Sequence, residues 1–323
     1  MSLKFNSIVD PGQEVVSQIA ALDGDNPFAT AEYLAVRKRL GAEGCVFVLT
    51  SDGAPVAGCL AFMTRGRMNS RIEITSLPVL PDSRLFWDGL FEFCKDQGIS
   101  VLSTHTFGST ETSIAELSNR VALRRRSEYR LDLTQPDLWH VLNRRHQRLI
   151  KRAIKAGLQV RGSDDGTARE MHLQLANLSL DRRRGRGEVI DSQITAADVD
   201  AFLECGAGSI VQAVIGEQVY ATMLVARSEN GAYAQSSGTS TEGRDLGASH
   251  FLFYEVARRM KAEGARVFNL GGASEGSVGL EQFKLGLGAE RIELESAEFY
   301  MGSPLKKFAT GAISLLKGLS FPI

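Results

Sequence analysis

A pattern of apolar runs and glycine-bearing turns occurs twice in the chain, once in each half. The first copy covers residues 46–62 around the turn SDGAP, and the second covers residues 210–226 around GEQ. β-Branched apolar runs divided by such turns predict β-hairpins. Each predicted hairpin is followed by a further strand candidate, over residues 71–77 and residues 232–237. Both halves of the chain are therefore expected to form β-sheets.

A predicted helix and a short predicted strand follow the hairpin in each half. Apolar side chains recur at helical spacing, and each helical segment ends in a glycine that fits the left-handed position after a helix. The segments are residues 85–98 with the strand 99–104, and residues 251–264 with the strand 265–270. The helix-ending glycine follows the turn glycine at nearly the same spacing in both halves, from Gly53 to Gly98 and from Gly216 to Gly264. The pattern predicts two α/β domains with mixed sheets that arose by internal duplication, although generic α/β patterning gives similar spacings.

Composition and length agree with a soluble globular protein of two domains. The chain has 323 residues, of which 43% are hydrophobic and 23% are charged. Its four cysteines are far apart and form no C-x-x-C pair, which argues against a disulfide framework, a zinc site or a redox dithiol. The first residues lack the apolar stretch of a secretory signal, and no apolar run is long enough to span a membrane. We therefore expect a cytoplasmic protein.

Positive charge is concentrated in the middle of the chain. Residues 120–186 contain 17 Lys or Arg against 7 Asp or Glu, whereas the net charge of the whole chain is −1. Within this region, residues 137–157 are predicted to form one strongly basic helix that connects the halves. This gives an N-terminal domain of residues 1–160 and a C-terminal domain of residues 161–323. An anionic partner and a merely solvated helix face explain the charge equally well.

A glycine-bearing segment in the second half is a candidate anion site. A predicted strand ends near Ser237, a loop follows, and a long helix begins near Ala248. Such a loop presents backbone N–H groups at a helix N-terminus, where the helix dipole favours an anion. Arg244 adds a cation beside the loop that suits a phosphate. Ordinary turn chemistry followed by a helix cap is the alternative interpretation.

The same segment resembles the pyrophosphate-binding loop of the GNAT superfamily of acyltransferases, R/Q-x-x-G-x-G/A. Arg244 and Gly247 match the motif, and Ala248 occupies the variable position after the glycine. Ser249 stands where the family has Gly or Ala. The resemblance implies that these residues hold the pyrophosphate of an acyl-CoA, with acetyl-CoA as the expected donor.

Further motifs resemble the Fem family of peptidoglycan aminoacyltransferases and related Fem-like GNAT acetyltransferases. A predicted strand ends in Asn269-Leu-Gly271-Gly272, and the motif G-x-x-x-F-K-x-G-x-G follows over residues 279–288. The sequence YRLDL at residues 129–133 and the basic helix after it resemble the junction between the two GNAT halves of that family. The resemblance covers most of the chain, but the helical arm of some Fem members has no counterpart. It implies two tandem GNAT-like domains, with Asn269, Gly271 and Gly272 at the donor site.

Lys284, within the last of these motifs, is the first candidate for a catalytic residue. The resemblance places it at the substrate site, and a short helix between glycine-rich segments can present one ammonium to a carbonyl, phosphate or carboxylate. A surface lysine between core side chains is the alternative. Candidates for a general base near it are Glu281, His250, Glu255 and Asp245. Glu281 shares a helix face with Lys284, which an ordinary salt bridge explains equally well.

A basic, glycine-rich cluster, residues 181–187, is predicted to form a loop after a helix over residues 168–180. Guanidinium groups bind phosphate and carboxylate in a bidentate manner. In Fem-like enzymes an equivalent basic loop borders the acceptor site, so the cluster is expected to hold an anionic substrate such as a cell-wall precursor. A solvated surface loop is the alternative. The arginines concerned are Arg182, Arg183, Arg184 and Arg186.

Neither the histidines nor the cysteines predict a metal site. The histidines outside the proposed reaction site form no ligand spacing with carboxylates; they are His105, His140, His146 and His172. The C-terminal segment, residues 304–321, is amphipathic and carries lysines apart from its apolar side. Docking onto the core and contact with the inner face of a membrane both explain this segment.

These observations favour an N-acyltransferase whose reaction site lies mainly in the C-terminal half. The amine of a cell-envelope or other small acceptor would attack acyl-CoA directly, without a covalent enzyme intermediate. One alternative is a Fem-type transfer from aminoacyl-tRNA to a peptidoglycan precursor. Another is a non-catalytic binding protein for an anionic glycan or lipid carrier. Nucleic-acid binding through the basic helix is a further hypothesis, which a steep salt dependence would reveal.

Overall fold

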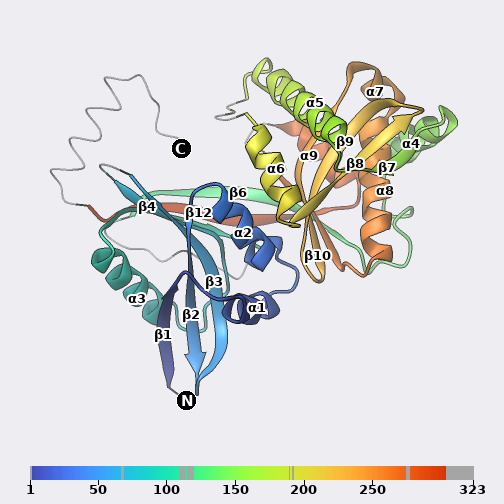
Figure 1. The fold of residues 1–323 in the computed structure, drawn as a ribbon. Helices are drawn as coiled ribbons and strands as arrows, with labels where there is room; N and C mark the ends of the chain where they lie inside the picture. Colours follow the sequence, from blue (N-terminus) through green and yellow to red (C-terminus); the bar gives the residue numbers. More distant parts are fainter. Residues whose placement is uncertain are drawn as a thin grey trace. The chain divides into compact units, whose positions relative to one another are not determined.

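The computed structural model describes residues 2–66, 69–108, 114, 120–188, 190, 193–273 and 277–302. Within these residues the chain has the mixed α/β fold that the sequence predicts (Figure 1). It divides into two compact units. Unit 1 contains the residues up to Leu22, Gly41–Arg125 and the chain from Leu294 onward, and unit 2 contains Asp23–Leu40 and Arg126–Glu293.

Unit 1 is a mixed sheet with helices on both faces. Its described strands, in order across the sheet, are β1 (Leu3–Val9), β2 (Glu43–Ser51), β3 (Ala54–Arg65), β4 (Ser70–Leu77), β5 (Ile99–Thr106) and, from Leu294 onward, β12 (Glu290–Tyr300). Its described helices are α1 (Gln13–Leu22) and α3 (Ser83–Asp96). β4 and β5 run parallel, and the other recorded pairs are antiparallel. β2 is buried along both faces because α1 packs on one side of the sheet and α3 on the other.

Unit 2 has the same strand order. Its described strands are β7 (Gln159–Gly162), β8 (Gly208–Ile215), β9 (Gln218–Arg227), β10 (Gly231–Thr239), β11 (Val267–Ala273) and, from Arg126 onward, β6 (Arg120–Asp132). Its described helices are η1 (Pro27–Ala29), α2 (Ala31–Arg39), α4 (Arg144–Lys155), α5 (Gly166–Arg184), α6 (Ala196–Glu204), α7 (Thr241–Leu246), α8 (Ala248–Ala262) and α9 (Val278–Gly286). α4 and α8 pack on one face of this sheet, and α5 and α6 pack on the other.

The sixth strand of each sheet comes from the opposite half of the sequence. β12, at the end of the described chain, pairs with β5 in unit 1, whereas β6 pairs with β11 in unit 2. The units therefore differ from the predicted domains of residues 1–160 and 161–323. The basic helix α4 belongs to unit 2, and the early segment with η1 and α2 also folds there, where Tyr33 packs near Phe202.

Both predicted hairpins are confirmed. β2 and β3 are antiparallel and joined so that Ser51 faces Ala54. The two residues between them, Asp52 and Gly53, have φ angles of 50° and 85°. Left-handed conformation at both central positions matches the right-handed twist of the two strands. β8 and β9 form the second hairpin around Gly216, which has a φ of 57°.

Two predicted helices have different limits in the structure. The basic helix begins at Arg144 rather than Asp137, because the Asn143 side chain accepts the His146 N–H at 2.8 Å and caps the helix there. The helix predicted over residues 168–180 extends to Arg184. Most of the predicted basic loop is therefore the last turn of α5.

The cysteines behave mainly as core residues, as the sequence predicts. Cys45, Cys59 and Cys94 are buried, and Cys205 is partly buried. Burial raises the pKa of the Cys45 and Cys94 thiols to about 12.

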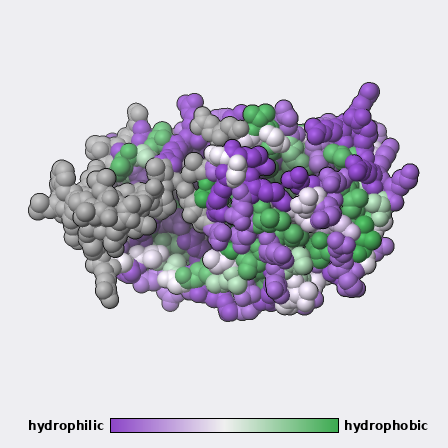
Figure 2. All heavy atoms as spheres, turned by 90° about the horizontal axis from the view of Figure 1, so that it is seen from above, coloured by the Kyte–Doolittle hydropathy of each residue, from purple (hydrophilic) through white to green (hydrophobic). Residues whose placement is uncertain are grey.

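Three features concern contact of the protein with a membrane: its surface, the length of its helices and its C-terminal segment. On the face in Figure 2, hydrophilic residues alternate with hydrophobic ones. No helix among the described residues is long and apolar enough to cross a membrane. The amphipathic segment 304–321 lies outside the described residues.

β12 comes from the second half of the sequence but completes the sheet of unit 1, which is formed mainly by the first half. A substitution in β12 is therefore expected to destabilise unit 1. Phe299 is fully buried, and its ring centroid lies 5.3 Å from that of Trp87 in the unit 1 core. Phe299→Ala is expected to lower the free energy of unfolding of unit 1 by about 3–5 kcal/mol. Denaturant unfolding in a Trp139→Phe background, where Trp87 fluorescence reports unit 1, measures this change. An unchanged midpoint would contradict the exchange; Val278→Ala, at an exposed position in unit 2, is the control.

Candidate active site

The parallel strands β10 and β11 are paired where they begin and part where they end. Pairing joins Gly231–Tyr233 to Val267–Asn269, although β10 continues to Thr239 and β11 to Ala273. Residues beyond the paired part of both strands line a cavity of about 1030 Å³. We call this cavity the strand wedge. It lies entirely within unit 2.

Helices from both faces of the sheet complete the strand wedge. α5 lines it from one face, and the beginning of α8 together with α9 lines it from the other. The titratable side chains that line it are Arg182, Arg183, Arg186, Glu188, Tyr233, Arg244, His250 and Lys284. Since five of these are basic residues of the Arg or Lys type and one is a carboxylate, the cavity favours an anionic ligand.

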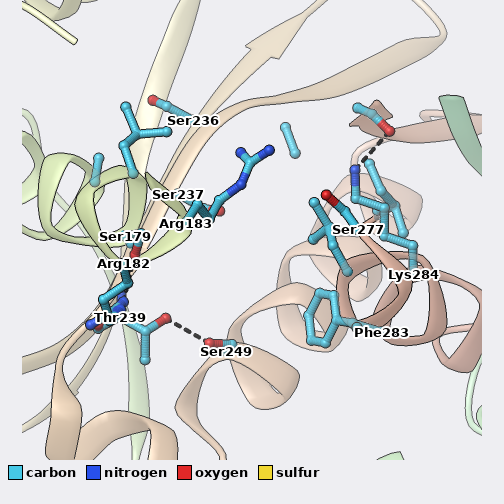
Figure 3. Close-up of a pocket in the computed structure, with 18 of the residues that line it drawn as sticks. Ser179, Arg182, Arg183, Ser236, Ser237, Thr239, Ser249, Ser277, Phe283 and Lys284 are labelled. Atoms are coloured by element: carbon cyan, nitrogen blue, oxygen red, sulfur yellow. Dashed lines mark hydrogen bonds between the residues drawn. The ribbon is translucent and has the colours of Figure 1, made fainter. Parts of the chain in front are cut away.

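Lys284 lies at the closed end of the strand wedge. Its side chain is buried, and its Nζ donates hydrogen bonds to the carbonyl oxygens of Gly271 at 2.8 Å and Gly272 at 2.6 Å. The Nζ also lies 5.2 Å from the centre of the Tyr129 ring. Figure 3 shows the Lys284 side chain on the side of the cavity opposite Ser236. The ammonium is therefore held where the two strands begin to part.

Burial changes the acidity of this lysine. It lowers the pKa of Lys284 to about 7; the charge of Glu128 acts against this change, and the charge of Arg183 adds to it. Both protonation forms are consequently populated near neutral pH. An ammonium whose other partners are neutral carbonyls can donate a hydrogen bond to negative charge that develops in a reaction.

His250 also lines the strand wedge, as a neutral ring. Its centroid lies 4.5 Å from that of His146 and 5.0 Å from that of Phe283, in edge-to-face contacts. Burial lowers the pKa of His250 to about 4, and the nearby His146 and Arg145 contribute further. At neutral pH this imidazole can accept or donate a hydrogen bond but carries no charge.

The other candidate bases do not reach the cavity. Glu281 pairs with Arg291, with 3.3 Å between the carboxylate and guanidinium atoms, and so does not form the salt bridge with Lys284 that the sequence allows. Glu255 pairs with Arg258 on its own helix. Glu281, Glu255 and Asp245 are absent from the described lining of the strand wedge.

The basic cluster at the end of α5 is divided between the cavity and the surface. Arg182, Arg183 and Arg186 line the strand wedge. Arg184 does not: its guanidinium donates to Asp181 at 2.7 Å and to the Ile190 carbonyl at 3.2 Å. Three of the four arginines that the sequence predicts to bind an anion therefore lie at the cavity.

Glu188 organises part of this cluster. Its carboxylate accepts hydrogen bonds from Arg183 at 2.7 Å, from Ser277 at 2.8 Å and from Arg186 at 3.1 Å. These contacts connect the end of α5 to the start of α9. Sequence reasoning missed both Glu188 and Ser277, because an isolated carboxylate and an isolated serine carry no motif.

The open end of the strand wedge contains a guanidinium group, that of Arg182, with one nitrogen that has no partner among the described residues. Arg182 donates through Nη2 to Ser179 Oγ and to the Thr239 carbonyl, both at 2.8 Å. Its Nη1 is buried and has no partner among the described residues. Burial lowers the pKa of Arg182, and repulsion from Arg244 and Arg186 lowers it further. An anion bound here would satisfy Nη1 and offset that repulsion.

Ser249, at the start of α8, lies at the same end of the cavity. Its hydroxyl is 2.6 Å from that of Thr239, a contact drawn in Figure 3. Ser249 is in the first turn of α8, where backbone N–H groups have no partner within the helix. Arg244, Thr239 and Ser249 thus surround the N-terminus of a long helix, which is a favourable position for an anion.

The expected glycine loop before α8 is instead the short helix α7. Ser240 caps it, and the N–H groups of Gly243, Arg244 and Gly247 all donate within the segment, at 2.9–3.2 Å. Helical hydrogen bonding thus occupies amides that the sequence analysis assigned to a ligand. Of the four predicted loop residues, only Arg244 and Ser249 line the cavity.

The packing of α4 against α8 explains why small residues, Gly247 and Ala248, precede and begin α8. Gly247 adopts a left-handed φ of 81°, and a Cβ there would lie 2.8 Å from the Leu149 carbonyl oxygen of α4. Ala248, the first residue of α8, is completely buried. Both residues allow α4 and α8 to approach closely rather than contacting the cavity.

The Asn-x-Gly-Gly motif is also divided. Gly271 and Gly272 line the strand wedge, whereas the buried Asn269 does not. The Asn269 amide donates to Glu128 at 2.6 Å, and its carbonyl oxygen accepts the Gly271 N–H at 2.8 Å. Asn269 therefore contacts protein groups at the position where the resemblance implied contact with the donor.

One buried histidine near the cavity was not among the predicted site residues. His172 lies with Nε2 2.8 Å from Ser236 Oγ and Nδ1 3.0 Å from Thr222 Oγ1. Burial lowers the pKa of His172 to about 4, so the ring is neutral and joins three elements of unit 2. Among the described residues, no three His, Cys, Asp or Glu side chains gather in a way that could hold a metal ion.

Comparison with known proteins agrees with this geometry. Residues 142–285, which contain all the residues that line the strand wedge, match the family model described as an acetyltransferase (GNAT) domain. No curated protein matches the chain significantly.

Solved structures with low sequence identity have a similar fold along nearly the whole chain. A crystal structure of FemX has a TM-score of 0.71 at 11% identity, covering 94% of this chain and 99% of that one. A tandem GNAT protein from the clavulanic acid biosynthesis pathway has a TM-score of 0.55 at 15% identity, covering 94% and 99%. L-PGS from Bacillus licheniformis has a TM-score of 0.55 at 14% identity, covering 96% and 98%.

The two sheets of equal strand order correspond to two GNAT-like domains, and the family match falls on the unit that contains the cavity. The chain therefore carries a GNAT acetyltransferase domain over residues 142–285, within a two-domain fold similar to those of FemX and of a tandem GNAT protein.

Proposed function

We propose that the protein transfers an acyl group from an acyl-CoA thioester to the amine of a small cell-envelope acceptor in the cytoplasm. The observation that carries this proposal is the arrangement of the strand wedge. A cationic end at Arg182 and Arg244 and a single buried ammonium, Lys284, lie at opposite ends of the diverging part of β10.

The length of the strand wedge favours a donor with an extended arm. The part of β10 from Tyr233 to Thr239 spans about 20 Å when extended. A phosphopantetheine arm separates the pyrophosphate of CoA from its thioester by a linear chain that can lie along such a strand. In an aminoacyl-tRNA, only one ribose separates the nearest phosphate from the ester carbonyl. The separation between the cationic end and Lys284 therefore supports the CoA thioester.

The strand edges in the strand wedge are suited to the amides of that arm. Recorded pairing between β10 and β11 stops at Tyr233 and Asn269, so the backbone groups beyond them do not continue the ladder. An extended ligand with amide groups can pair with such an edge in the manner of an added strand. The partly apolar walls, formed by Phe253, Leu270 and Phe283, suit its methylene groups.

The groups at the open end fit a pyrophosphate. Arg182 offers a buried Nη1 with no partner in the described residues, Arg244 adds a second guanidinium, and the first turn of α8 adds backbone N–H groups. Helix α7 takes up several of the amides that a typical loop would supply. Binding of the phosphates is therefore expected to depend more on guanidinium groups than on the backbone.

Lys284 has the geometry to stabilise the transition state. The amine nitrogen of the acceptor attacks the thioester carbonyl carbon, the C–N bond forms, and the C–S bond breaks with release of the thiol. The nitrogen loses one proton, and the departing sulfur gains one. Lys284 in its protonated form donates a hydrogen bond to the carbonyl oxygen while that oxygen carries negative charge. The buried position increases the strength of this interaction.

Two similar proteins support a cell-envelope acceptor. Two structural neighbours are L-PGS and a domain of a putative lysylphosphatidylglycerol synthetase, the latter from Agrobacterium fabrum. Arg183 and Arg186 also line the strand wedge, and both pair with Glu188, which accepts a hydrogen bond from Ser277. Through these arginines the acceptor would be held by a phosphate or carboxylate of its own.

Transfer from aminoacyl-tRNA remains the second candidate, and α4 is the observation that favours it. All six of its Arg and Lys side chains are exposed, and the helix contains no acidic residue. Such a face suits a nucleic-acid backbone. A binding protein without catalytic activity is a weaker hypothesis, because the chain carries an acyltransferase domain.

Calorimetry with the purified full-length protein distinguishes the donors. Acetyl-CoA and longer acyl-CoAs are expected to bind with micromolar affinity, and inorganic pyrophosphate is expected to compete with them. Aminoacyl-tRNA is expected to bind weakly, with an affinity that falls steeply with salt concentration. Binding of charged tRNA without binding of any CoA would overturn the proposed donor.

Replacing Arg244 tests the pyrophosphate end. Arg244→Gln removes one guanidinium from the strand wedge and is expected to weaken pyrophosphate and acyl-CoA binding about tenfold to a hundredfold. Calorimetry measures both affinities. The matched control is Arg258→Gln, which removes an exposed arginine that pairs with Glu255 and does not line the cavity. Equal losses in both variants would argue against an anion site at Arg244.

Replacing Lys284 tests the reaction end. Lys284→Met keeps much of the volume of the side chain and removes its charge. It is expected to lower kcat about a hundredfold to a thousandfold with little change in KM for the acyl-CoA. Thiol release from acyl-CoA measures both quantities. Unchanged kcat would remove Lys284 from the mechanism.

The pH dependence identifies the form of Lys284 that works. Because the pKa of Lys284 is lowered to about 7, its protonated form is present below that pH and is lost above it. With an acceptor whose amine has a pKa well below 7, kcat/KM is therefore expected to fall as pH rises through about 7. A rise through the same range would mean that Lys284 acts as a neutral base.

A further inference from the structure

Two successive backbone carbonyls converge on the ammonium of Lys284. They belong to Gly271 and Gly272 and accept hydrogen bonds from the same Nζ at 2.8 and 2.6 Å. In a regular strand, successive carbonyls point to opposite edges, so one cation cannot reach both. The backbone of β11 must therefore depart from regular strand geometry at this point.

A bulge in β11 produces this departure. In the pairing of β11 with β6, Asn269 faces Arg130 and Gly272 faces Glu128, so β11 has one more residue than β6 in this interval. Gly271 has a left-handed φ of 75°. A bulge with a glycine in this conformation redirects the following peptide groups.

The Asn269 side chain fixes the bulge from inside. Its carbonyl oxygen accepts the Gly271 N–H at 2.8 Å, which closes a short turn over Leu270. Its amide nitrogen donates to Oε2 of Glu128 at 2.6 Å. Since the second contact sets which way the amide group faces, Glu128 determines that the oxygen points to Gly271.

Glu128 is an unusual residue for a structural role alone. It is 2% exposed, and its second oxygen accepts a hydrogen bond from Arg126 at 2.5 Å. A buried carboxylate is costly unless its oxygens are paired, and here both are. A glutamine would avoid that cost, but its amide nitrogen would face one of the two donors, Asn269 or Arg126.

We propose that Glu128 is a positioning residue for acyl transfer, which acts through Asn269 and the Gly271–Gly272 bulge to hold the ammonium of Lys284 at the closed end of the strand wedge. This inference rests on the proposed function for the catalytic role of Lys284. The placing of Lys284 by Glu128 is a separate matter and is measurable without any substrate.

The charge of Glu128 acts in the same direction as its hydrogen bonds. The groups that face Lys284 are Glu128 and Tyr129 of β6, Arg183 of α5 and the two glycine carbonyls of β11. Glu128 raises the pKa of Lys284, whereas burial and Arg183 lower it. Removing the Glu128 charge should therefore leave a larger share of Lys284 deprotonated at neutral pH.

The test measures the titration of Lys284 directly. Protein labelled with 13C at the lysine ε-carbons is titrated by NMR, and the Lys284 signal is assigned by its disappearance in Lys284→Met. In Glu128→Gln the pKa of Lys284 is expected to fall by about one unit. The alkaline limb of kcat/KM should move to lower pH by the same amount, and kcat should fall about tenfold to a hundredfold with KM nearly unchanged.

A second variant covers the case in which Glu128→Gln does not fold. Asn269→Ala leaves the Glu128–Arg126 pair in place but removes the contact that fixes Gly271. It is expected to lower both kcat and the pKa of Lys284, because the converging carbonyls no longer favour the charged form. Glu204→Gln, which removes an ion pair with Arg169 elsewhere in unit 2, is the control and should change neither quantity.

The outcomes separate this inference from the proposed function. Unchanged Lys284 pKa and kcat in a folded Glu128→Gln or Asn269→Ala protein would overturn the positioning role, even if Lys284→Met is inactive. Conversely, a shifted Lys284 pKa together with an active Lys284→Met would support the positioning of Lys284 and refute its part in catalysis.

Discussion

The parting of β10 and β11 determines where this enzyme can bind a substrate. Both strands are irregular just beyond their last paired residues: β10 shifts register against β9 between Ala234 and Ser236, and β11 shifts against β6 between Asn269 and Gly272. A bulge bends its strand, and both shifts lie just beyond the point where the pairing of β10 with β11 stops. The opening thus follows from backbone geometry, and side chains of α5, α8 and α9 then give it charge.

Unit 1 has the same strand order without such an opening. Its parallel pair, β4 and β5, remains paired from Ser70 and Ile99 as far as Leu77 and Thr106, near the ends of both strands, despite register shifts after Ser70 and after Ile74. A cluster of large aromatic side chains, which includes Trp87 and Phe299, fills one face of this sheet. If the two units arose by duplication, only the second has kept or acquired separated strands in the described part of the chain. The chemistry is therefore expected to belong to unit 2.

Local patterns in the sequence were sufficient to predict most helices and strands, but they did not predict which distant segments these elements contact. The hairpins, the long helices and the position of Lys284 beside Gly271 and Gly272 depend on periodicity and short motifs, and these are visible in the chain. The start of α4 was wrong because the Asn143 cap competes successfully with a longer helical pattern. α7 was missed because a six-residue helix that contains Gly243 has weak propensity.

Long-range pairing explains the remaining differences. Nothing near Glu128 or Glu188 in the sequence indicates that one contacts Asn269 and the other contacts Ser277, since these contacts join segments far apart in the chain. The domain boundary failed for the same reason. A cut at residue 160 treats each half as self-contained, whereas β6 and β12 complete the sheets of the opposite halves.

This exchange of strands has a consequence for synthesis on the ribosome. Most of unit 1 emerges first, but the edge of its sheet beside β5 remains open until β12 has been translated, near the end of the chain. An unpaired strand edge is a template for incorrect pairing with other chains. The nascent protein must therefore carry an incomplete first sheet through the synthesis of the whole second unit, and chaperone contact during that interval would protect the edge along β5.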